Sequence, residues 1–479
     1  MNESFNDRES AIETGPAMQN VYLQSLGAAG TVTGSKHLLL TPGGNVMIDC
    51  GLFQGIKALR EKNWESLPVN LADISALILT HAHLDHCGYI PLLVRNGYRN
   101  KIYMSQPTRD LVELILRDCA KLQEEDAQKA NKYGYSRHHP AKALYTVKDV
   151  EAALSYFEVC EIYKTISLAK QLSFSLYPCG HIAGACSVEI SCFEKTIVFS
   201  GDIGRDQSEL LPGPELLGQA DFVVMESTYG DRLHSKNDPS QDLAGAINDT
   251  IFNKGNVLIP CFAVGRAQEV MHLIYRLKQH NLIPSSIPVY LDSPMAAVAG
   301  KTLVHFPEWF TIDEKECADM FNSVTINKDY KDTEKIIKRA GPKIVLAASG
   351  MLTGGRVLEY LKRYLGDERN TILLIGFQAE GTRGRALLNH IHELKIHGQY
   401  YPVVAKVQEI EGLSAHADQS ELITWLKQFH NSVSGVYLVH GEPCAQDTLR
   451  VKIQDELKLT VKIMKPYHKE LLFSLNQQL

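Results

Sequence analysis

Residues 80–88 read THAHLDHCG and place four potential metal ligands within six positions, directly after the apolar run ISALIL. In a chain of 479 residues with 18 histidines, three His and one Asp at these offsets are expected by chance in about one such chain in a thousand. A structural use explains the pattern poorly, because four neighbouring polar side chains would each need a buried hydrogen-bond partner. The segment therefore predicts a buried strand that ends in a metal-binding loop.

The spacing of these ligands indicates two ions. In an extended backbone, residues i and i+2 point to the same side, so His81 and His83 can face one ion from a single strand end. Asp85 and His86 fall on the following turn and point elsewhere. We therefore expect a second ion beside the first, at the roughly 3.5–4 Å separation of two-metal hydrolases.

More distant segments supply further candidates at the ends of apolar strands. His181 in PCGHIAG, Asp202 in FSGDIGR and His440 in LVHGE each stand beside glycine. Any one of them alone is more often a turn or capping residue than a ligand, but their joint occurrence favours coordination. Asp49 in VMIDCG also ends a strand, and we expect it to orient ligand histidines through hydrogen bonds.

Composition narrows the class of protein. The content of 44% hydrophobic and 22% charged residues is typical of a globular protein. The net charge of −6 excludes a globally basic nucleic-acid binder, so a polyanion would be met locally. The ten cysteines form no C-x-x-C pair and indicate reduced thiols. Because no apolar run has the length of a membrane span or of a secretory leader, we expect a cytoplasmic protein without membrane contact.

The order of patterns predicts one unit inserted into another. Short apolar runs with Gly-rich turns (VYLQSLGAA, KHLLLT, NVMIDCG) predict antiparallel strands, and TRDLVELILRDCAKLQEEDAQKAN has helical spacing. From DFVVMEST onward, apolar strands alternate with helices, as in a parallel α/β unit. We expect a leader over residues 1–20, a first unit over 21–229, the insertion over 230–400, and the rest of the first unit over 401–479.

These motifs carry a family resemblance. IDCGLFQG, THAHLDHCGYIP, CGHIAGA and FSGDIGR resemble the metallo-β-lactamase fold, and ESTYGDR, SAHAD and VHGE are similar to the extra motifs of its β-CASP branch of nucleases. IPCFAVGRAQE, YLDSPMA, SGMLTGGR and GFQAEGTRGR resemble the β-CASP insertion of bacterial and archaeal ribonucleases and of the eukaryotic messenger-RNA 3′-end-processing endonuclease. The resemblance implies an α/β protein with the four-layer αββα metallo-β-lactamase fold and an inserted parallel α/β domain.

The resemblance also implies the contents of the site. It assigns one zinc ion to His81, His83 and His181, the other to Asp85, His86 and His440, and the bridging position to Asp202 together with a hydroxide. Asp49 would support these ligands from behind. The family pairs Glu226 of ESTYG with His416 of SAHAD as an acid catalyst, and Asp85 counts with them among the catalytic residues. Manganese could replace zinc, although abundant imidazole favours zinc.

The implied reaction is hydrolysis of RNA by a zinc-dependent endoribonuclease. Two zinc ions lower the pKa of a shared water, and a histidine held cationic by a carboxylate can protonate the leaving 3′ oxygen. The products would be a 5′-phosphate and a 3′-hydroxyl. Family members that act on DNA usually lack a histidine at the VHGE position, so His440 favours RNA as the partner.

Glycine-flanked residues of the insertion are candidates for phosphate contact, through guanidinium groups or loop amides: Arg266, Ser349, Arg356, Arg383 and Arg385. Plain turns and helix starts explain any one of them equally well.

Three other functions remain open. A DNA nuclease needs the same chemistry. A hydrolase of thioesters, lactams or small phosphoesters is disfavoured, because small substrates need no insertion of this length. An inactive RNA-binding scaffold is opposed by the complete ligand set. Whether the chain acts alone or as a homodimer is also open.

Overall fold

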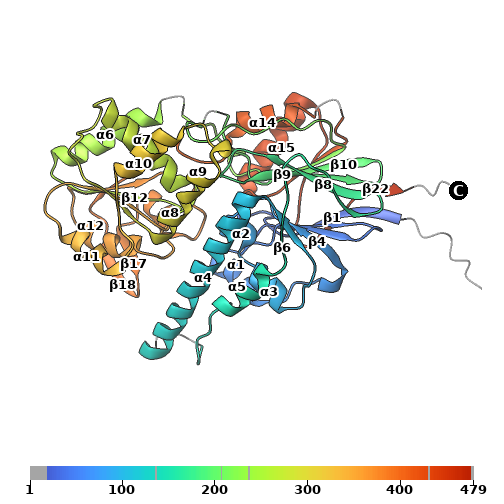
Figure 1. Ribbon diagram of the computed structural model, residues 1–479, viewed down its shortest axis with the longest axis horizontal. Helices are drawn as coiled ribbons and strands as arrows, with labels where there is room; N and C mark the ends of the chain where they lie inside the picture. Colours follow the sequence, from blue (N-terminus) through green and yellow to red (C-terminus); the bar gives the residue numbers. More distant parts are fainter. Residues whose placement is uncertain are drawn as a thin grey trace, which may run out of the picture.

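The computed structural model describes residues 19–134, 138–206, 208–235, 238–410, 412–429 and 432–475. The expected leader over 1–20 lies outside this part of the chain except for its last two residues. The described residues form a β-sandwich unit and a parallel α/β unit beside it (Figure 1). None of their helices is both long and apolar enough to cross a membrane.

The first sheet of the sandwich follows the order β22 (Lys469–Leu475), β1 (Gln19–Gly27), β2 (Lys36–Leu40), β3 (Asn45–Ile48), β4 (Ile74–Ile78), β5 (Ile102–Met104) and β6 (Phe157–Val159). Strands β1 to β3 pair antiparallel, as the meander predicts. Strands β4 to β6 then continue the sheet in parallel. The connection from β3 to β4 contains α1 (Lys57–Glu61), η1 (Lys62–Trp64) and η2 (Leu71–Asp73).

The second sheet follows the order β21 (Val461–Ile463), β20 (Gly435–Leu438), β11 (Phe222–Met225), β10 (Lys195–Phe199), β9 (Cys186–Cys192), β8 (Leu172–Pro178) and β7 (Ile166–Ala169). Strands β7 to β10 are antiparallel, whereas β10, β11, β20 and β21 run parallel. The alternating strand–helix pattern begins at DFVVMEST, but the expected bounds keep this run in the first unit, and its strand β11 lies in this sheet.

Helices cover the outer face of each sheet, and apolar side chains fill the space between the sheets. Helices α3 (Ile90–Arg95), α4 (Gln106–Tyr133) and α5 (Val147–Leu154) pack on the first sheet. Helices α14 (Gln419–Lys427) and α15 (Pro443–Leu457) pack on the second sheet. The resulting helix–sheet–sheet–helix stack confirms the αββα fold (Figure 1).

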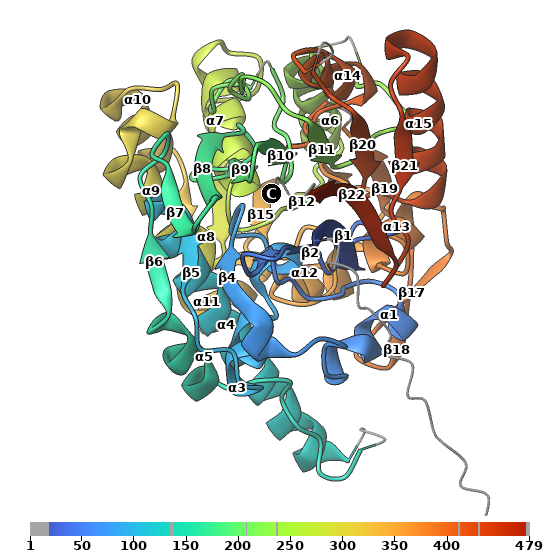
Figure 2. The same cartoon turned by 90° about the vertical axis from the view of Figure 1, so that its right-hand side faces the viewer.

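Helix α4 is the longest helix of the described residues. Its N-terminus is fixed next to the loop after β8, because the hydroxyls of Ser105 and Thr108 donate to the Gly184 carbonyl at 2.7 and 2.8 Å. Its C-terminal half extends away from the body of the molecule in both views (Figures 1 and 2). The helix therefore connects the edge that carries His181 to the periphery.

The inserted unit has a parallel sheet with the order β14 (Thr325–Ile326), β13 (Val289–Asp292), β15 (Ile344–Ala347), β12 (Val257–Pro260), β16 (Thr371–Leu374) and β19 (Lys406–Glu409). All of its strand pairs are parallel, as predicted. Since β19 pairs with β16, this sheet continues beyond residue 400, the expected end of the insertion.

Helices cover both faces of this sheet, which gives the insertion two apolar cores. One face carries α6 (Pro239–Phe252), α7 (Arg266–Gln279) and α10 (Glu314–Asn322). The other carries α11 (Tyr330–Lys338), α12 (Val357–Tyr364) and α13 (Arg383–Leu388). The remaining elements are α8 (Pro294–Ala299), α9 (Lys301–His305), η3 (Pro307–Trp309) and the hairpin of β17 (Glu393–Ile396) and β18 (Gln399–Pro402).

The packing between the sandwich sheets gives a stability prediction. Phe174 in β8 is 1% exposed, and its ring lies 5.3 Å from the ring of Tyr103 in β5. Phe174→Ala should lower the free energy of unfolding by about 3–5 kcal/mol, because it removes apolar contact and leaves a cavity. Phe252 at the end of α6 is 87% exposed, so Phe252→Ala should change it by no more than about 0.5 kcal/mol. Denaturant unfolding followed by circular dichroism compares the two variants, and equal losses would contradict this packing.

Candidate active site

The structure brings the seven expected ligand side chains together at one edge of the sandwich. They come from the ends of strands in both sheets: His81 and His83 after β4, Asp85 and His86 in α2 (Leu84–Cys87), His181 after β8, Asp202 after β10, and His440 after β20. The segment with Asp85 and His86 is a short helix that begins after His83, where the sequence predicted a turn. The site therefore depends on the packing of both sheets.

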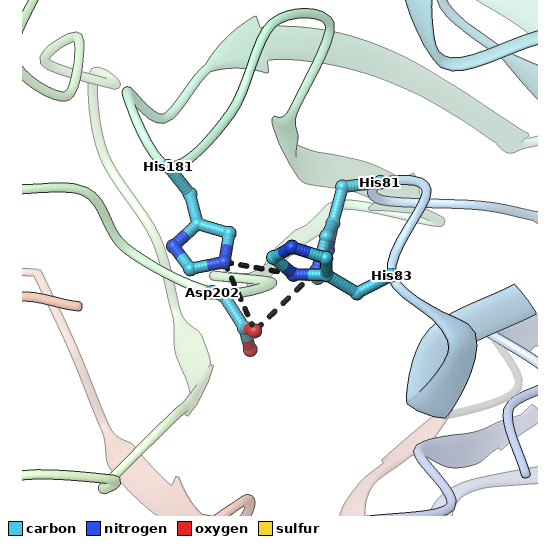
Figure 3. A group of neighbouring side chains, drawn as sticks. All are labelled: His81, His83, His181 and Asp202. Atoms are coloured by element: carbon cyan, nitrogen blue, oxygen red, sulfur yellow. Dashed lines mark hydrogen bonds and ion pairs between the residues drawn. The ribbon is translucent and has the colours of Figure 1, made fainter. Parts of the chain in front are cut away.

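Four of these residues form the first group (Figure 3). Nδ1 of His83 lies 3.1 Å from Nε2 of His81 and 3.1 Å from Nε2 of His181. Oδ2 of Asp202 approaches the Nε2 atoms of His81 and His181 at 3.4 and 3.5 Å. Three ring nitrogens and one carboxylate oxygen thus face a common point, as in a four-coordinate zinc site.

The second group lies on the other side of Asp202. Nε2 of His440 is 3.2 Å from Nε2 of His86 and 3.4 Å from Oδ2 of Asp85. Oδ1 of Asp202 lies 3.3 Å from Nε2 of His86. Asp202 therefore turns one carboxylate oxygen toward each group, which is the geometry of a bridging ligand.

The electrostatics of Asp202 fit a cation at this place. Asp202 is 2% exposed, and its Oδ1 atom has no hydrogen-bond partner among the described residues. Burial opposes its charge, but His440, His86 and His81 together hold the pKa of Asp202 well below its usual range. A buried, ionised carboxylate beside converging imidazole nitrogens is a donor set suited to zinc. The residues present therefore fit a metal cofactor.

Asp49 belongs to neither ligand group but is connected to both by hydrogen bonds. Its Oδ2 atom lies 2.7 Å from Nδ1 of His86, which leaves Nε2 of that ring facing the second group. Its Oδ1 atom accepts hydrogen bonds from the Thr80 backbone amide and hydroxyl, each at 2.9 Å, and the same hydroxyl lies 3.0 Å from Nδ1 of His81. Asp49 is thus placed to orient one histidine of each group.

Glu226 and His416 form a pair next to the ligands. Nδ1 of His416 lies 3.1 Å from Oε2 of Glu226, which is fully buried and accepts a 2.6 Å hydrogen bond from the Ile203 amide at Oε1. Burial lowers the pKa of His416, but the carboxylates of Glu226 and Asp202 outweigh it, so the pKa is raised above its ordinary value. The ring centroids of His416 and His181 are 4.6 Å apart. A histidine able to hold a proton therefore stands beside the first group.

Two further residues contact this pair, and the sequence motifs did not lead us to expect them. The Thr228 hydroxyl donates to Oε2 of Glu226 at 2.5 Å and lies 3.1 Å from Nδ1 of His440. A ring nitrogen of His234 lies 2.9 Å from the His416 carbonyl oxygen. The position of Thr228 two residues after Glu226 in ESTYG could have indicated its role, whereas nothing in the sequence marks His234.

All five phosphate-contact candidates make contacts within the protein, and two of them connect segments of the insertion. Arg356 pairs at 2.6 Å with Asp292, which is 0% exposed, and donates to the Lys328 carbonyl at 2.8 Å. Arg383 donates to the carbonyls of Lys395 and Leu352 at 2.9 and 3.0 Å. Both guanidinium groups therefore join segments of the insertion to one another.

The other three candidates differ in their surroundings. Arg266 begins α7, is buried, and pairs with Glu269 of the same helix. The Ser349 hydroxyl accepts a 3.0 Å hydrogen bond from the Thr353 amide and closes a turn. Arg385 reaches across to the sandwich unit, where its Nη2 atom lies 3.1 Å from both carboxylate oxygens of Glu442, two residues beyond His440.

Comparison with known families identifies the fold and the branch. The metallo-β-lactamase superfamily model matches residues 32–121, the Beta-Casp domain model matches 267–387, and the model of the Zn-dependent metallo-hydrolase RNA specificity domain matches 400–464. The protein named Ribonuclease TTHA0252 from Thermus thermophilus is 36% identical over 426 residues, which cover 87% of this chain and 92% of that protein. The chain belongs to the β-CASP ribonuclease family of the metallo-β-lactamase superfamily. It is a metal-dependent hydrolase of the nuclease class, and the resemblance noted in its motifs is confirmed.

Further relatives carry related names. An RNase J-like protein of Methanocaldococcus jannaschii is 31% identical, with 88% of this chain and 92% of that protein covered. The transcription termination factor FttA of the same organism is 30% identical, with 87% of this chain and 66% of that longer protein covered. A crystal structure of a protein of unknown function from Enterococcus faecalis V583 has a TM-score of 0.52 at 12% identity, covers 94% of this chain and 100% of its own, and supports the fold alone.

The contacts of Arg356 give a second prediction. Arg356→Ala should cost about 3–5 kcal/mol in the free energy of unfolding, because it leaves the buried Asp292 carboxylate without its cation. Arg369 pairs with Asp367 at the surface, where its side chain is 60% exposed, so Arg369→Ala should cost no more than about 1 kcal/mol. Urea unfolding of the metal-loaded variants makes the comparison. An Arg356→Ala protein that unfolds at the parental urea concentration would show that the ion pair is dispensable.

Proposed function

We propose that this chain is a two-zinc endoribonuclease that hydrolyses RNA phosphodiesters and leaves a 5′-phosphate and a 3′-hydroxyl. The proposal depends on the carboxylate of Asp202, which directs one oxygen to each ligand group. The Glu226–His416 pair lies beside both groups. A metal cluster without the Glu226–His416 pair could bind a substrate but would lack a proton donor for hydrolysis. The cluster together with a proton donor supports hydrolysis.

Two ions are favoured by the number of donors. The two groups offer five imidazoles and two carboxylates, which exceed the four ligands that one tetrahedral zinc accepts. Bound zinc ions would supply a water of lowered pKa and would neutralise charge on the phosphate oxygens. The chain itself keeps His81 and His86 in fixed orientations through Asp49, so the ligands are arranged before a substrate arrives.

The proposed acid is His416. Because its Nδ1 atom faces Glu226, its Nε2 atom is left to hold a proton for the leaving 3′ oxygen. The raised pKa of His416, caused by the neighbouring carboxylates of Glu226 and Asp202, favours the protonated ring. Glu226 is itself fixed by the Ile203 amide and the Thr228 hydroxyl, so the imidazole is held against a rigid carboxylate. This arrangement supports protonation of the leaving group in the step that breaks the phosphodiester bond.

The choice of RNA is supported by the relatives and by His440. The relative from Thermus thermophilus is named a ribonuclease, and the match over residues 400–464 is to an RNA specificity domain. Phosphate contact by Arg266, Ser349 and Arg385 stays a proposal. Arg356 and Arg383 would support RNA binding through the shape of the insertion, since their guanidinium groups hold Asp292 and backbone carbonyls. The cytoplasmic location and a homodimer remain predictions.

The two-metal proposal predicts the metal content. Elemental analysis of the purified chain should find about two zinc ions per chain, because seven ligand side chains converge in two groups. His83→Ala should lose metal from the first group and abolish cleavage. His468 is 58% exposed in its side chain and lies outside both groups, so His468→Ala should keep the parental metal content. A fully active parent with one tightly bound ion would refute the two-metal arrangement.

The acid assignment and the RNA assignment can be tested together. His416→Ala should keep its metal and cut a fluorescent RNA oligonucleotide about 10²–10⁴ times more slowly, since a general acid typically contributes that factor. The parent should leave a DNA oligonucleotide of the same sequence largely intact, and its RNA fragments should be ligatable at their 5′-phosphates. A His416→Ala protein that cuts at the parental rate, or arrives without metal, would contradict the role of His416. Equal cleavage of DNA would contradict the RNA assignment.

A further inference from the structure

A buried histidine outside both ligand groups is connected to them. His37 lies in β2 and is 4% exposed, with its ring 6.5 Å from the ring of Phe199 in the opposite sheet. In the register of the first sheet it stands between Ser25 of β1 and Ile48 of β3, and Asp49 directly follows Ile48. In KHLLL it looks like an ordinary residue of an apolar strand, and no sequence pattern distinguishes it from its neighbours.

A chain of hydrogen bonds leads from His37 to a metal-ligand ring. Nδ1 of His37 lies 2.9 Å from the Ser25 hydroxyl, and its Nε2 atom lies 3.3 Å from the Ser35 hydroxyl. The Ser35 hydroxyl donates to Oδ2 of Asp49 at 3.2 Å, and the same oxygen lies 2.7 Å from Nδ1 of His86. All five side chains are buried, so bulk water does not compete for these bonds.

Counting protons fixes the direction of every bond in this chain. Asp49 can only accept, so the single hydroxyl proton of Ser35 points toward it. The Ser35 oxygen must then accept from His37, which places the proton of the neutral imidazole on Nε2. The unprotonated Nδ1 atom in turn accepts the hydroxyl proton of Ser25. Each donor in this series of hydrogen bonds therefore points toward the Asp49 carboxylate. Within the series, the His37 ring accepts at Nδ1 and donates from Nε2.

The surroundings of His37 keep the ring neutral, as this assignment requires. Burial lowers the pKa of His37 to about 3, with Asp49 raising it and His86, His440 and Lys36 lowering it further. A cationic ring would donate from both nitrogens, so its Nδ1 atom could no longer accept the Ser25 hydroxyl proton. The effect of His37 on Asp49 therefore passes through hydrogen bonds.

We propose that His37 is a positioning residue of the metal centre, which acts through Ser35 and Asp49 to hold the ring of His86 in its metal-binding orientation. The inference rests on the proposed pair of metal sites. The effect should be largest at the site of Asp85, His86 and His440, because Oδ2 of Asp49 serves both Ser35 and His86. Oδ1 of Asp49 serves Thr80, which contacts His81 of the first group. Partners that orient metal-binding histidines typically contribute about 10–100-fold to metal affinity.

The plain alternative is that His37 only fills space between the sheets, and two substitutions separate these roles. His37→Leu keeps a side chain of similar bulk and removes both hydrogen bonds. His37→Gln keeps a neutral side chain with a donor that can reach Ser35 and an acceptor for Ser25. A matched control is His272 in α7, which is 2% exposed and bonded to Glu316 at 2.7 Å in the inserted unit. His272→Leu removes a buried histidine without touching the metal centre.

The measurements are zinc affinity, by competition with a chromogenic chelator, and the absorption spectrum of the cobalt-substituted protein. His37→Leu should bind one of its two ions about tenfold more weakly and change the cobalt spectrum, since ligand orientation sets both. His37→Gln should recover most of the affinity and the parental spectrum. His272→Leu should match the parent in both measurements, whatever stability it loses.

The outcomes distinguish this inference from the proposed function. A parent that binds a single ion contradicts the two-zinc function. A parent with two ions and a His37→Leu variant of parental affinity and spectrum overturns the role of His37 alone, as does a His37→Gln variant no better than His37→Leu. If His37→Leu does not fold, Ser25→Ala removes only the first bond of the chain. It should weaken the same ion by a smaller factor, and unchanged affinity in Ser25→Ala would then overturn the inference.

Discussion

The gathering of five imidazoles and two carboxylates at one edge of the sandwich, all of them buried except the half-buried His83 and Asp85, is the constraint on which the rest of the structure depends. Such a cluster is costly unless its buried polar atoms have hydrogen-bond partners or a cation, and Asp202 Oδ1 has no hydrogen-bond partner among the protein atoms described. Its ligands follow strands of both sheets, so the two sheets must pack in one register for the nitrogens to meet. Asp49 and Glu226 extend this order outward, since each carboxylate fixes a histidine and is itself held by backbone amides. The metal centre and the sandwich core thus specify each other.

The sequence was most informative where ligands are close together or follow a recognisable strand. His81 to His86 could be selected as candidate ligands because chance and ordinary packing explain the motif poorly, and His181, Asp202 and His440 because each ends an apolar strand beside glycine. Antiparallel strands β1 to β3, the long helix α4 and the parallel sheet of the insertion also follow from periodicity. These features are encoded by neighbouring residues, and the family motifs joined them into one fold.

The sequence could not predict which distant residues contact each other, or which strands pair, in the folded protein. The contact of Arg356 with Asp292 joins residues of two strand–helix units, and a Gly-Arg pair looks the same whether it binds a phosphate or a buried carboxylate. Strand β11 reads like the first strand of the insertion, but it pairs with β10 and β20, since its apolar run suits any buried parallel position. His37 has no polar neighbours along the strand after it, and its hydrogen-bond partners come from β1 and the loop before β2.

The pairing of β11 with β20 also affects how the protein folds during its synthesis on the ribosome. These adjacent strands are separated along the chain by the whole insertion, and the bridge between Tyr229 and Asp418 joins the points where the chain leaves and re-enters the sandwich. Synthesis proceeds from the N-terminus, so His416, β20 and His440 emerge only after the whole insertion. A nascent chain that ends within the insertion contains the first group together with Asp85 and His86, but it lacks His440 of the second group and His416, the proposed proton donor. The order of elements therefore delays assembly of the complete site until most of the encoding message has been translated.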